Sequence, residues 1–483
     1  MSGHEMTPTK MKVGKIAEMF AASDLLVTAA LRDIEVTSIT HDSRQADLGS
    51  LFCCVPGDRY DGHSFAGDAV ARGANALLVD HFLPEIDSAV AQIIVKDVRS
   101  CVGAVAAKVY GDPSRQLSVV GITGTNGKTT TAHLLASILR SDQIKTEILG
   151  TLSGGFTTPE AADLQKTFAD MLDVGVRAIA MEVSSHALTL GRVNGTHFSQ
   201  TVFTNLGIDH LDFHGTQEEY FRAKLRLFNS EFSGTGIVNA DDPFGQKIIE
   251  QADISMIPFS MRDIHDLEVS AVEHSYTWRE HRIVVAIGGT VNVMNSIAAA
   301  TTAGEMGVAP QGIIQGLREL PPISGRFEKV EAGQDFVVLV DFAHTPDGLA
   351  QVLRSVREST PGGRVLVVFG CGGDRDKMKR PMMGEIAVSL ADHVVVTSDN
   401  PRSENPETII ASVVAGIPEH LRHRLVATEV DRRLAIRRAL RMAEPADVVV
   451  IAGKGHETTQ TIGAEVLPFD DRLVVTEILR GVG

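Results

Sequence analysis

The chain has 483 residues, and at about 150 residues per domain this length predicts about three domains. Its hydrophobic content of 43% is typical of a globular protein, and it contains no run of about 18 apolar residues that could cross a membrane. The net charge of −16, from 45 basic and 61 acidic residues, argues against non-specific binding to nucleic acid or to a membrane surface.

The beginning of the chain and its cysteines predict a cytoplasmic protein. Residues 1–15 contain no apolar segment of the length that a signal peptide needs. The four cysteines lack the paired spacing of a zinc site. So few thiols in so long a chain are typical of a reducing compartment, and we expect neither export nor a membrane anchor.

The strand and helix patterns divide the chain into three parts. Residues 1–113 end at a turn-rich Tyr-Gly-Asp-Pro sequence, residues 114–332 alternate short apolar strands with helices, and residues 333–483 repeat this alternation. The strands that we predict cover residues 178–183, 201–203, 236–239, 336–340, 364–369, 393–397 and 447–451. The alternation indicates an α/β fold with doubly wound parallel sheets, whose ligands bind at the carboxyl ends of the strands.

The sequence GITGTNGKTT, residues 121–130, has the layout of a phosphate-binding loop between an apolar strand and a helix over 132–139. Its glycines let backbone N–H groups approach phosphate oxygens, Lys128 can reach the β- and γ-phosphates, and Thr129 can hold Mg²⁺. The spacing differs from that of a standard P-loop, which has glycine where this chain has Ile122. The alternative is a turn rich in glycine and threonine with no ligand.

Three further features of the middle part are candidates for metal chemistry. Glu182 ends a predicted buried strand, where nucleotide-hydrolysing folds hold Mg²⁺, although it could also be an edge residue that caps the next helix. Residues 204–215 are dense in possible ligands, yet a single histidine there is more often a hydrogen-bonded loop residue. Lys224 shares a predicted helix face with aromatic residues, which suggests either chemistry near the phosphates or a lysine that extends its amine to solvent.

Polar loops follow three predicted strands of the third part, and we expect them to face one pocket. These loops are residues 372–375, 399–402 and 453–457. Arg402 offers a planar fork for a carboxylate, and Glu457 can accept from an ammonium. The alternative is that residues 370–373 form a nucleotide-binding turn and that Arg402 is a surface charge.

Taken together, these motifs resemble the Mur ligase family over nearly the whole chain and in the family's order. The motifs are residues 123–130, 182–186, 205–210, 325–328, 341–348 and 453–457. The resemblance implies an N-terminal α/β domain that binds a uridine nucleotide, a central ATPase domain and a C-terminal Rossmann-like domain that binds an amino acid. It also implies that ATP phosphorylates the D-Glu carboxylate of UDP-N-acetylmuramoyl-L-Ala-D-Glu, and that a diamino acid then attacks the acyl phosphate to give an amide, ADP and phosphate.

The resemblance assigns roles in the nucleotide and metal sites. It implies that ATP is bound by Gly124, Thr125, Asn126, Gly127, Lys128, Thr129, Thr130, Asn295, Arg326, Asp341 and His344. One Mg²⁺ would be held by Thr129 and Glu182, and a second would be served by Glu182, His210 and Lys224, with Lys224 carbamylated. Lys128, Lys224, Glu182 and His210 are the expected catalytic residues.

The resemblance also assigns the substrate contacts. Those to the UDP-muramoyl-dipeptide would come from His41, Ser43, Asp58, Arg59, Tyr60, Thr157, Thr158, Ser184 and Arg192, although residues 42–44 alone could be a polar turn. Those to the amino acid would come from Arg375, Asp399, Asn400, Pro401, Arg402, Gly453 and Glu457. Similar enzymes with Asp-Asn-Pro-Arg use meso-diaminopimelate, whereas relatives that add lysine lack this arginine.

Several alternatives to this interpretation stay open. The same ligase could add L-lysine, or the chain could be a folylpolyglutamate synthetase, a cyanophycin synthetase or a later peptidoglycan ligase on the same plan. A binding module gated by a nucleotide is the non-enzymatic alternative. We expect ATP and Mg²⁺ as cofactors, small-molecule substrates only, no nucleic acid, no membrane insertion, and a monomer.

Overall fold

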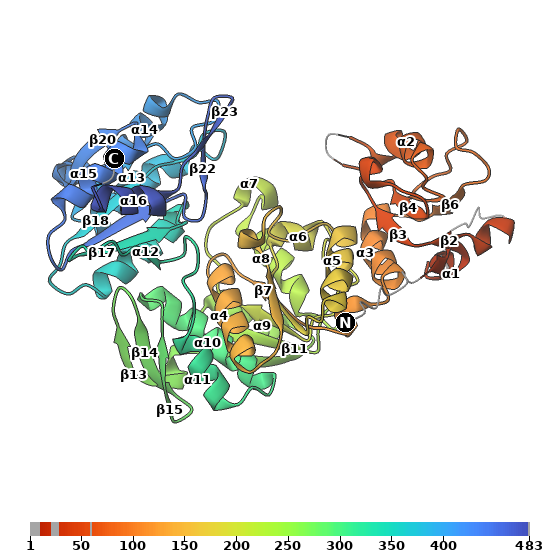
Figure 1. Ribbon diagram of the computed structural model, residues 1–483, viewed down its shortest axis with the longest axis horizontal. Helices are drawn as coiled ribbons and strands as arrows, with labels where there is room; N and C mark the ends of the chain where they lie inside the picture. The colour runs from red at the N-terminus through yellow and green to blue at the C-terminus, as the bar shows by residue number, and fades with distance from the viewer. Residues whose placement is uncertain (1–9, 21–28, 58–59, 482–483) are drawn as a thin grey trace.

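The computed structural model describes residues 10–20, 29–57 and 60–481. Figure 1 shows three sheet-containing bodies in succession, with the N-terminal part in red and orange at one end and the C-terminal part in blue at the other. The α/β class with three domains is therefore confirmed. Within the described residues, no helix combines the length and apolar character needed to span a membrane.

The N-terminal part is built on a four-stranded parallel sheet with the order β3-β4-β5-β6. Its strands are β3 (Ser38–Thr40), β4 (Ser50–Cys53), β5 (Ala76–Val79) and β6 (Ala91–Ile94). The helices α1 (Val13–Glu18) and α3 (Val98–Val109) cover one face, and α2 (Ala66–Ala71) covers the other. A small antiparallel pair, β1 (Met11–Lys12) and β2 (Glu35–Val36), lies beside α1.

The central part contains a six-stranded parallel sheet with the order β12-β11-β10-β7-β9-β8. Its strands are β7 (Ser118–Thr123), β8 (Thr146–Leu149), β9 (Ala178–Glu182), β10 (Gln200–Phe203), β11 (Thr235–Asn239) and β12 (Ser255–Phe259). Successive residues of β7 alternate between the two cores, because side chains point to opposite faces of a strand: Val120 joins one core and Val119 the other. Each strand that we predicted here agrees with the observed one to within one residue.

Helices cover both faces of the central sheet. One face is covered by α4 (Lys128–Ser141), α10 (Thr290–Glu305) and α11 (Pro310–Arg318). The opposite face carries α5 (Ala161–Asp173), α6 (Ser185–Thr189), α8 (Gln217–Leu225) and α9 (Pro243–Gln251), while the short α7 (Leu211–His214) precedes α8. Helix α5 also contacts α3, so it joins the N-terminal and central parts.

A three-stranded antiparallel sheet, which the sequence patterns did not predict, follows the central sheet. It consists of β13 (Ile264–Val269), β14 (His274–Trp278) and β15 (His281–Val285), and β15 packs on α11. Only one side of this sheet is apolar: Tyr276 and Ile283 are fully buried, whereas most of β13 is exposed. Figure 1 shows it as a separate green layer below the C-terminal part.

The C-terminal part has a six-stranded sheet with the order β16-β17-β21-β18-β19-β20, in which only β16 is antiparallel to its neighbour. The strands are β16 (Glu328–Lys329), β17 (Val337–Asp341), β18 (Val365–Phe369), β19 (His393–Thr397), β20 (Leu425–Glu429) and β21 (Val448–Ala452). The four predicted strands agree with β17, β18, β19 and β21 to within one residue. A hairpin of β22 (Thr459–Ile462) and β23 (Glu465–Pro468) extends from this sheet.

The helices of the C-terminal part are divided between the two faces of its sheet. One face carries α12 (Pro346–Glu358), α13 (Lys379–Leu390) and α14 (Pro406–Val414). The other carries α15 (Arg432–Met442) and α16 (Asp471–Leu479). This two-faced covering leaves the carboxyl ends of the strands as the edge where polar loops gather.

Candidate functional site

The phosphate-type loop connects β7, in the middle of the central sheet, to the first turn of α4. Gly124 and Gly127 have φ angles of 154° and 86°. A Cβ atom at Gly124 would collide with Thr204, and one at Gly127 would collide with Asn295, so both positions require glycine. The Nζ of Lys128 donates to the carbonyls of Gly124 and Thr125, each at 2.8 Å, and is therefore held over the loop.

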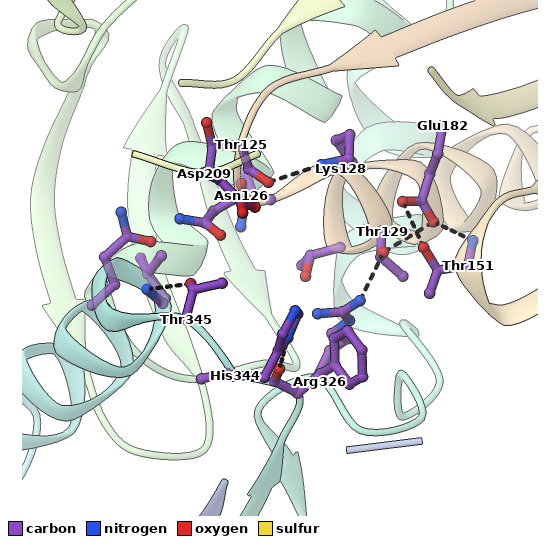
Figure 2. Close-up of a pocket in the computed structure, with 18 of the residues that line it drawn as sticks. Thr125, Asn126, Lys128, Thr129, Thr151, Glu182, Asp209, Arg326, His344 and Thr345 are labelled. Carbon is purple, nitrogen blue, oxygen red and sulfur yellow. Dashed lines mark hydrogen bonds between the residues drawn. The ribbon is translucent and has the colours of Figure 1, made fainter. Parts of the chain in front are cut away.

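Glu182 is the centre of a buried hydrogen-bond network at the end of β9. Its Oε1 accepts from Thr129 Oγ1 at 2.9 Å and from the Thr151 backbone N–H at 2.9 Å, and its Oε2 accepts from Thr151 Oγ1 at 3.2 Å. Figure 2 shows Arg326 reaching from the opposite wall, where its Nη2 lies 3.3 Å from Thr129 Oγ1. A carboxylate next to hydroxyl groups at a helix N-terminus is a donor set that suits a hard cation such as Mg²⁺.

The alternative that Glu182 is an edge residue that caps the next helix is wrong. Strand β9 lies between β7 and β8, so Glu182 is not on an edge strand. The next helix, α6, is capped by Ser184, whose hydroxyl accepts from the Ala187 backbone N–H at 3.2 Å.

Lys224, on α8, points into the protein and not toward solvent. Only 1% of its surface is exposed, and its Nζ donates to the Gly124 carbonyl at 2.9 Å beneath the loop. Burial, helped by the neighbouring Lys128 ammonium, holds the pKa of Lys224 well below its usual value. The alternative of a solvated ammonium is therefore wrong, and the structure favours a neutral amine.

His210 is the N-cap residue of α7 and has a left-handed φ of 53°. Its ring lies 4.7 Å from the ring of His186 and 6.1 Å from that of Tyr220, measured between centroids. Desolvation of the imidazole, with His186 and the lysines nearby, lowers the pKa of His210 to about 4. The ring is thus neutral near pH 7, which is the form that binds metals.

These groups line one cavity of about 330 Å³ between the central and C-terminal parts. All the predicted nucleotide residues except Gly124 line it, together with Glu182, His210, Lys224 and the predicted substrate residues Thr157 and Ser184. A second cavity of about 320 Å³ adjoins it and shares Val291, Asn295 and Gln351. The loop, the acidic group and the buried lysine therefore meet in one place, as the sequence predicted.

The C-terminal wall of the large cavity depends on Asp341. Its two carboxylate oxygens accept from the backbone N–H groups of Phe327 and Ala343, both at 2.8 Å. These bonds fix the turn that carries Arg326, whose guanidinium lies 4.7 Å from the centroid of the Phe342 ring. His344 Nδ1 donates to the Phe342 carbonyl, 2.8 Å away.

Some lining residues were not predicted from the sequence. They are Thr151, Ser185, Asp209, Tyr220, Phe342, Thr345 and Gln351. Tyr220 could have been found from the sequence, since it lies one helical turn before Lys224. In the structure its hydroxyl is 3.0 Å from Thr125 Oγ1. Thr151 carried no sequence signal, because strand β8, which it follows, was not recognised.

Four predicted muramoyl-peptide residues gather beside Glu182. Thr158 Oγ1 donates to the Glu182 carbonyl at 3.0 Å and accepts from the Ser184 backbone N–H at 3.1 Å. Arg192 Nη1 donates to the Thr158 carbonyl at 3.2 Å, and its Nη2 pairs with Glu160 at 2.7 Å. Thr157 Oγ1 lies 3.2 Å from Thr151 Oγ1.

The structure describes some, but not all, of the residues predicted to bind the uridine nucleotide. His41 lines a third cavity of about 190 Å³, between the N-terminal and central parts, which Arg99 and Leu190 also line. Ser43 lies in a 3₁₀ turn, Ser43–Gln45, whose cap Asp42 also binds Arg44 side chain to side chain. Tyr60 is 72% exposed, and Asp58 and Arg59 lie outside the described residues.

The three loops of the C-terminal part converge. Asn400 Nδ2 donates to Glu457 Oε2 at 2.7 Å, and the buried Lys454 Nζ donates to the same oxygen at 2.9 Å. Arg402 Nη1 donates to the Gly373 carbonyl at 2.7 Å, which joins the second loop to the first. Asp399 and Pro401 are buried, Gly453 has a φ of 113°, and Arg375 is exposed at the rim.

Comparisons with known proteins agree with this arrangement. The model of the Mur ligase middle domain matches residues 122–303, that of the Mur ligase glutamate ligase domain matches 325–455, and that of the Mur ligase family catalytic domain matches 35–110. The chain therefore belongs to the Mur ligase family. The resemblance seen in the sequence is confirmed, and with it the class of ATP-dependent, ADP-forming ligases.

Individual relatives cover almost the whole chain. The UDP-N-acetylmuramoyl-L-alanyl-D-glutamate–2,6-diaminopimelate ligase of Streptomyces avermitilis is 41% identical over 98% of both chains. The ligase of the same name from Syntrophomonas wolfei is 43% identical over 93% of this chain and 96% of its own. A solved structure of a ligase of this name is 31% identical, with a TM-score of 0.70 over 98% of this chain and 99% of its own.

Proposed function

We propose that the protein joins 2,6-diaminopimelate, as the meso isomer, to the D-Glu carboxylate of UDP-N-acetylmuramoyl-L-alanyl-D-glutamate with the hydrolysis of ATP to ADP and phosphate. The observation that supports this proposal is that the phosphate loop and the predicted peptide site share one wall of the large cavity. There Glu182 binds Thr129 of the phosphate loop through its side chain and Thr158 of the predicted peptide site through its carbonyl. A carboxylate substrate held by the second group would lie next to a triphosphate held by the first.

The nucleotide is proposed to lie along the loop, with its phosphates at the N-terminus of α4. Backbone N–H groups and the partial positive charge of the helix end favour the phosphate oxygens. Lys128 and Arg326 approach from two sides and neutralise the charge that develops when the γ-phosphoryl group moves to the D-Glu carboxylate. The adjoining cavity, which shares Asn295, is our proposed place for the adenine base.

Thr129 and Glu182 are proposed to hold Mg²⁺, and the donor types fit this ion. Bound Mg²⁺ supplies further charge neutralisation at the phosphates. We propose that Lys224 serves a second ion as a carbamate. Its lowered pKa leaves the amine lone pair free to attack the carbon of CO₂, and loss of one proton from nitrogen then gives an anion. His210, neutral and close to the same cavity, completes this group.

The diamino acid is proposed to bind where the three C-terminal loops meet. The Nε and Nη2 edge of Arg402 can bind the distal carboxylate in a bidentate manner, while Asn400 and Glu457 can bind the distal ammonium. Asp399 and Gly453 shape the floor of this pocket, and Arg375 lies at its rim. L-Lysine lacks the distal carboxylate and would leave Arg402 without its partner.

A cytoplasmic location and a monomeric state remain parts of the proposal. All four cysteines are free thiols, which is typical of proteins in a reducing compartment. Cytoplasm is also where ATP is supplied.

The test is an assay of phosphate release from ATP with each substrate left out in turn. We expect release only when UDP-N-acetylmuramoyl-L-Ala-D-Glu and meso-diaminopimelate are both present, because the amine is needed to consume the acyl phosphate. The product should carry one additional diaminopimelate by mass. Turnover with folate and glutamate, and none with the muropeptide, would overturn the substrate assignment in favour of a folylpolyglutamate synthetase.

A further inference from the structure

Two histidines and an aspartate meet in the N-terminal part, remote from the nucleotide cavity. His63 lies in the 3₁₀ turn Gly62–Phe65, after β4, while Asp80 and His81 directly follow β5. One ligand atom from each of the three lies within 4.8 Å of the others. Strands β4 and β5 are adjacent and parallel, so their carboxyl ends bring these two loops together.

Hydrogen bonds fix how the His63 ring is protonated. Its Nδ1 lies 2.6 Å from Asp61 Oδ1, and because a carboxylate only accepts, Nδ1 carries the hydrogen. The Asp80 backbone N–H donates to His63 Nε2 at 3.3 Å, so Nε2 carries the lone pair. A carboxylate that accepts from the outer nitrogen of an imidazole is the usual support of a metal-binding histidine.

That lone pair faces another acceptor. Asp80 Oδ1 lies 3.1 Å from His63 Nε2, and the same oxygen lies 2.5 Å from His81 Nδ1. The two imidazole rings stack with their centroids 4.6 Å apart. Because a carboxylate only accepts, His81 Nδ1 carries the hydrogen of this contact, and a divalent cation bound between Asp80 and the two imidazoles would replace that hydrogen and neutralise the carboxylate.

We propose that His63 Nε2, Asp80 and His81 Nδ1 bind a zinc-class cation. Two imidazole nitrogens and one carboxylate suit Zn²⁺ or Co²⁺, whereas Mg²⁺ and Ca²⁺ prefer oxygen ligands alone. Tetrahedral bonds of roughly 2.0–2.2 Å place ligand atoms about 3.3 Å apart, which is close to the 3.1 Å between His63 Nε2 and Asp80 Oδ1. The exposed His81 would move away from its 2.5 Å contact with Asp80 to reach the same separation. His63 is buried, with 7% of its side chain exposed, but Asp80 at 35% and His81 at 60% leave room for entry and for water as the fourth ligand.

The bound ion would stabilise the turn that contains Asp61 and His63. Residues Pro56 and Asp61 pair as an isolated antiparallel bridge. Asp61 orients His63, and the ion would join His63 to the end of β5, so the bridge between Asp61 and Pro56 would be held to the sheet. The proposal does not depend on the identity of the ligase substrate.

The test is titration of the full-length protein with Zn²⁺ by calorimetry in Mg²⁺-containing buffer, with a chelator competition for the affinity. We expect His81→Asn and Asp80→Asn each to bind one equivalent fewer than the unaltered protein. The matched control is His265→Asn, an exposed histidine 3.8 Å from Asp266 in the three-stranded sheet, which should lose none. The result is the difference in zinc stoichiometry between each variant and the unaltered protein. Any zinc bound by His186, His210 and His214 is therefore the same in both and does not affect it.

Asp61→Asn tests the supporting carboxylate. Asparagine can still cap the 3₁₀ turn, so the site should keep its stoichiometry but bind Zn²⁺ about 10- to 100-fold more weakly. The Co²⁺-loaded protein should show visible absorption bands of tetrahedral cobalt that His81→Asn removes. Equal stoichiometry and affinity in the unaltered protein, His81→Asn and Asp80→Asn would overturn the proposal and leave a network of hydrogen bonds only.

Discussion

Arg432 and Asp471 form an ion pair whose side chains are completely buried, with Nε and Nη2 each 2.7 Å from one carboxylate oxygen. The same guanidinium donates to the carbonyl of Ser398 at 3.2 Å and to that of Ala452 at 3.0 Å. These two carbonyls directly precede Asp399 and Gly453, which begin two of the loops proposed to bind the amino acid. The pair therefore ties α15 and α16 to the backbone that shapes that pocket.

Arg432→Met should be strongly destabilising, because it leaves Asp471 as an unpaired buried charge. We expect a loss of about 3–5 kcal/mol from the stability of the C-terminal part, measured by amide hydrogen exchange of β19 and β21. The double variant Arg432→Met with Asp471→Leu should recover part of this loss, since no charge then remains buried. Removing the exposed pair of Arg222 and Glu219 is the control and should cost less than about 1 kcal/mol.

Lys128→Ala should reduce turnover by about three orders of magnitude or more with little change in thermal stability. The side chain contacts only loop carbonyls, and its proposed partner is the triphosphate, so its loss removes stabilisation of the transition state. Although β7 is central in the sheet, the loop lies at the carboxyl end of that strand, outside the core. Steady-state kinetics measures the loss of turnover and thermal melting measures the stability, with Lys166→Ala, at an exposed position, as the control. A melting temperature of Lys128→Ala well below that of the unaltered protein would indicate a structural role for Lys128.

Lys224→Ala should abolish ligation at saturating Mg²⁺, with partial rescue by added formate or acetate. The rescue is expected because a small carboxylate can occupy the space of the proposed carbamate. Intact-mass measurement of the unaltered protein should show about 44 Da added, the mass of one CO₂. Full activity of the alanine variant would contradict a role for this residue.

Stability should fall between about pH 6.5 and pH 4 because of His274. Its ring is buried on β14, binds the Ile287 carbonyl and Ser296 Oγ, and has a pKa lowered to about 4, chiefly by desolvation. In this range the unfolded chain takes up a proton that the folded chain does not, so unfolding is favoured as the pH falls. The contribution at pH 5 is about 2 kcal/mol. His274→Gln, compared with the unaltered protein by urea unfolding at pH 7 and pH 5, should show the smaller pH dependence; an unchanged slope would contradict this account.

The elements that could be predicted from the sequence are those with a local signal. Strands such as β18 and β21 are continuous apolar runs buried on both faces, so their positions follow from hydropathy alone. Strand β13 carries His265, Asp266 and Glu268 and is mostly exposed, so its pattern resembles a loop. The antiparallel sheet that contains it could not be recognised for that reason.

The site was predictable where a short motif carries the chemistry and not where distant segments meet. The phosphate loop and Glu182 each follow a strand, and topology brings such ends together. Contacts across the interface have no such signal: Arg326 reaches Thr129, which is 197 positions away, and Asp347 accepts from the Ile208 backbone N–H at 2.8 Å. Asp347 thereby joins α12 to the loop of His210, a contact that depends on how the two domains pack.

The choice of amino acid provides the last prediction, and it depends on Arg402. This residue has a left-handed φ of 51°, and its backbone N–H donates to the Thr461 carbonyl at 3.0 Å, so the side chain leaves a fixed backbone. Its Nη1 is held by the Gly373 carbonyl, which leaves the guanidinium plane in one orientation. A rigid fork of this kind discriminates strongly, because a substrate without the matching carboxylate leaves the Nε and Nη2 donors of Arg402 without the acceptor that they are positioned to bind.

With both amino acids at equal concentration, the enzyme should incorporate meso-diaminopimelate at least about a hundredfold better than L-lysine. Arg402→Ala should collapse this preference mainly by lowering kcat/KM for diaminopimelate. Arg402→Lys should restore little of it, since a lysine ammonium cannot form two parallel bonds to a carboxylate. Arg375→Ala at the exposed rim is the matched control and should have a smaller effect. Preferential addition of lysine by the unaltered protein would refute the assignment of the amino acid, while the ligase itself would stand.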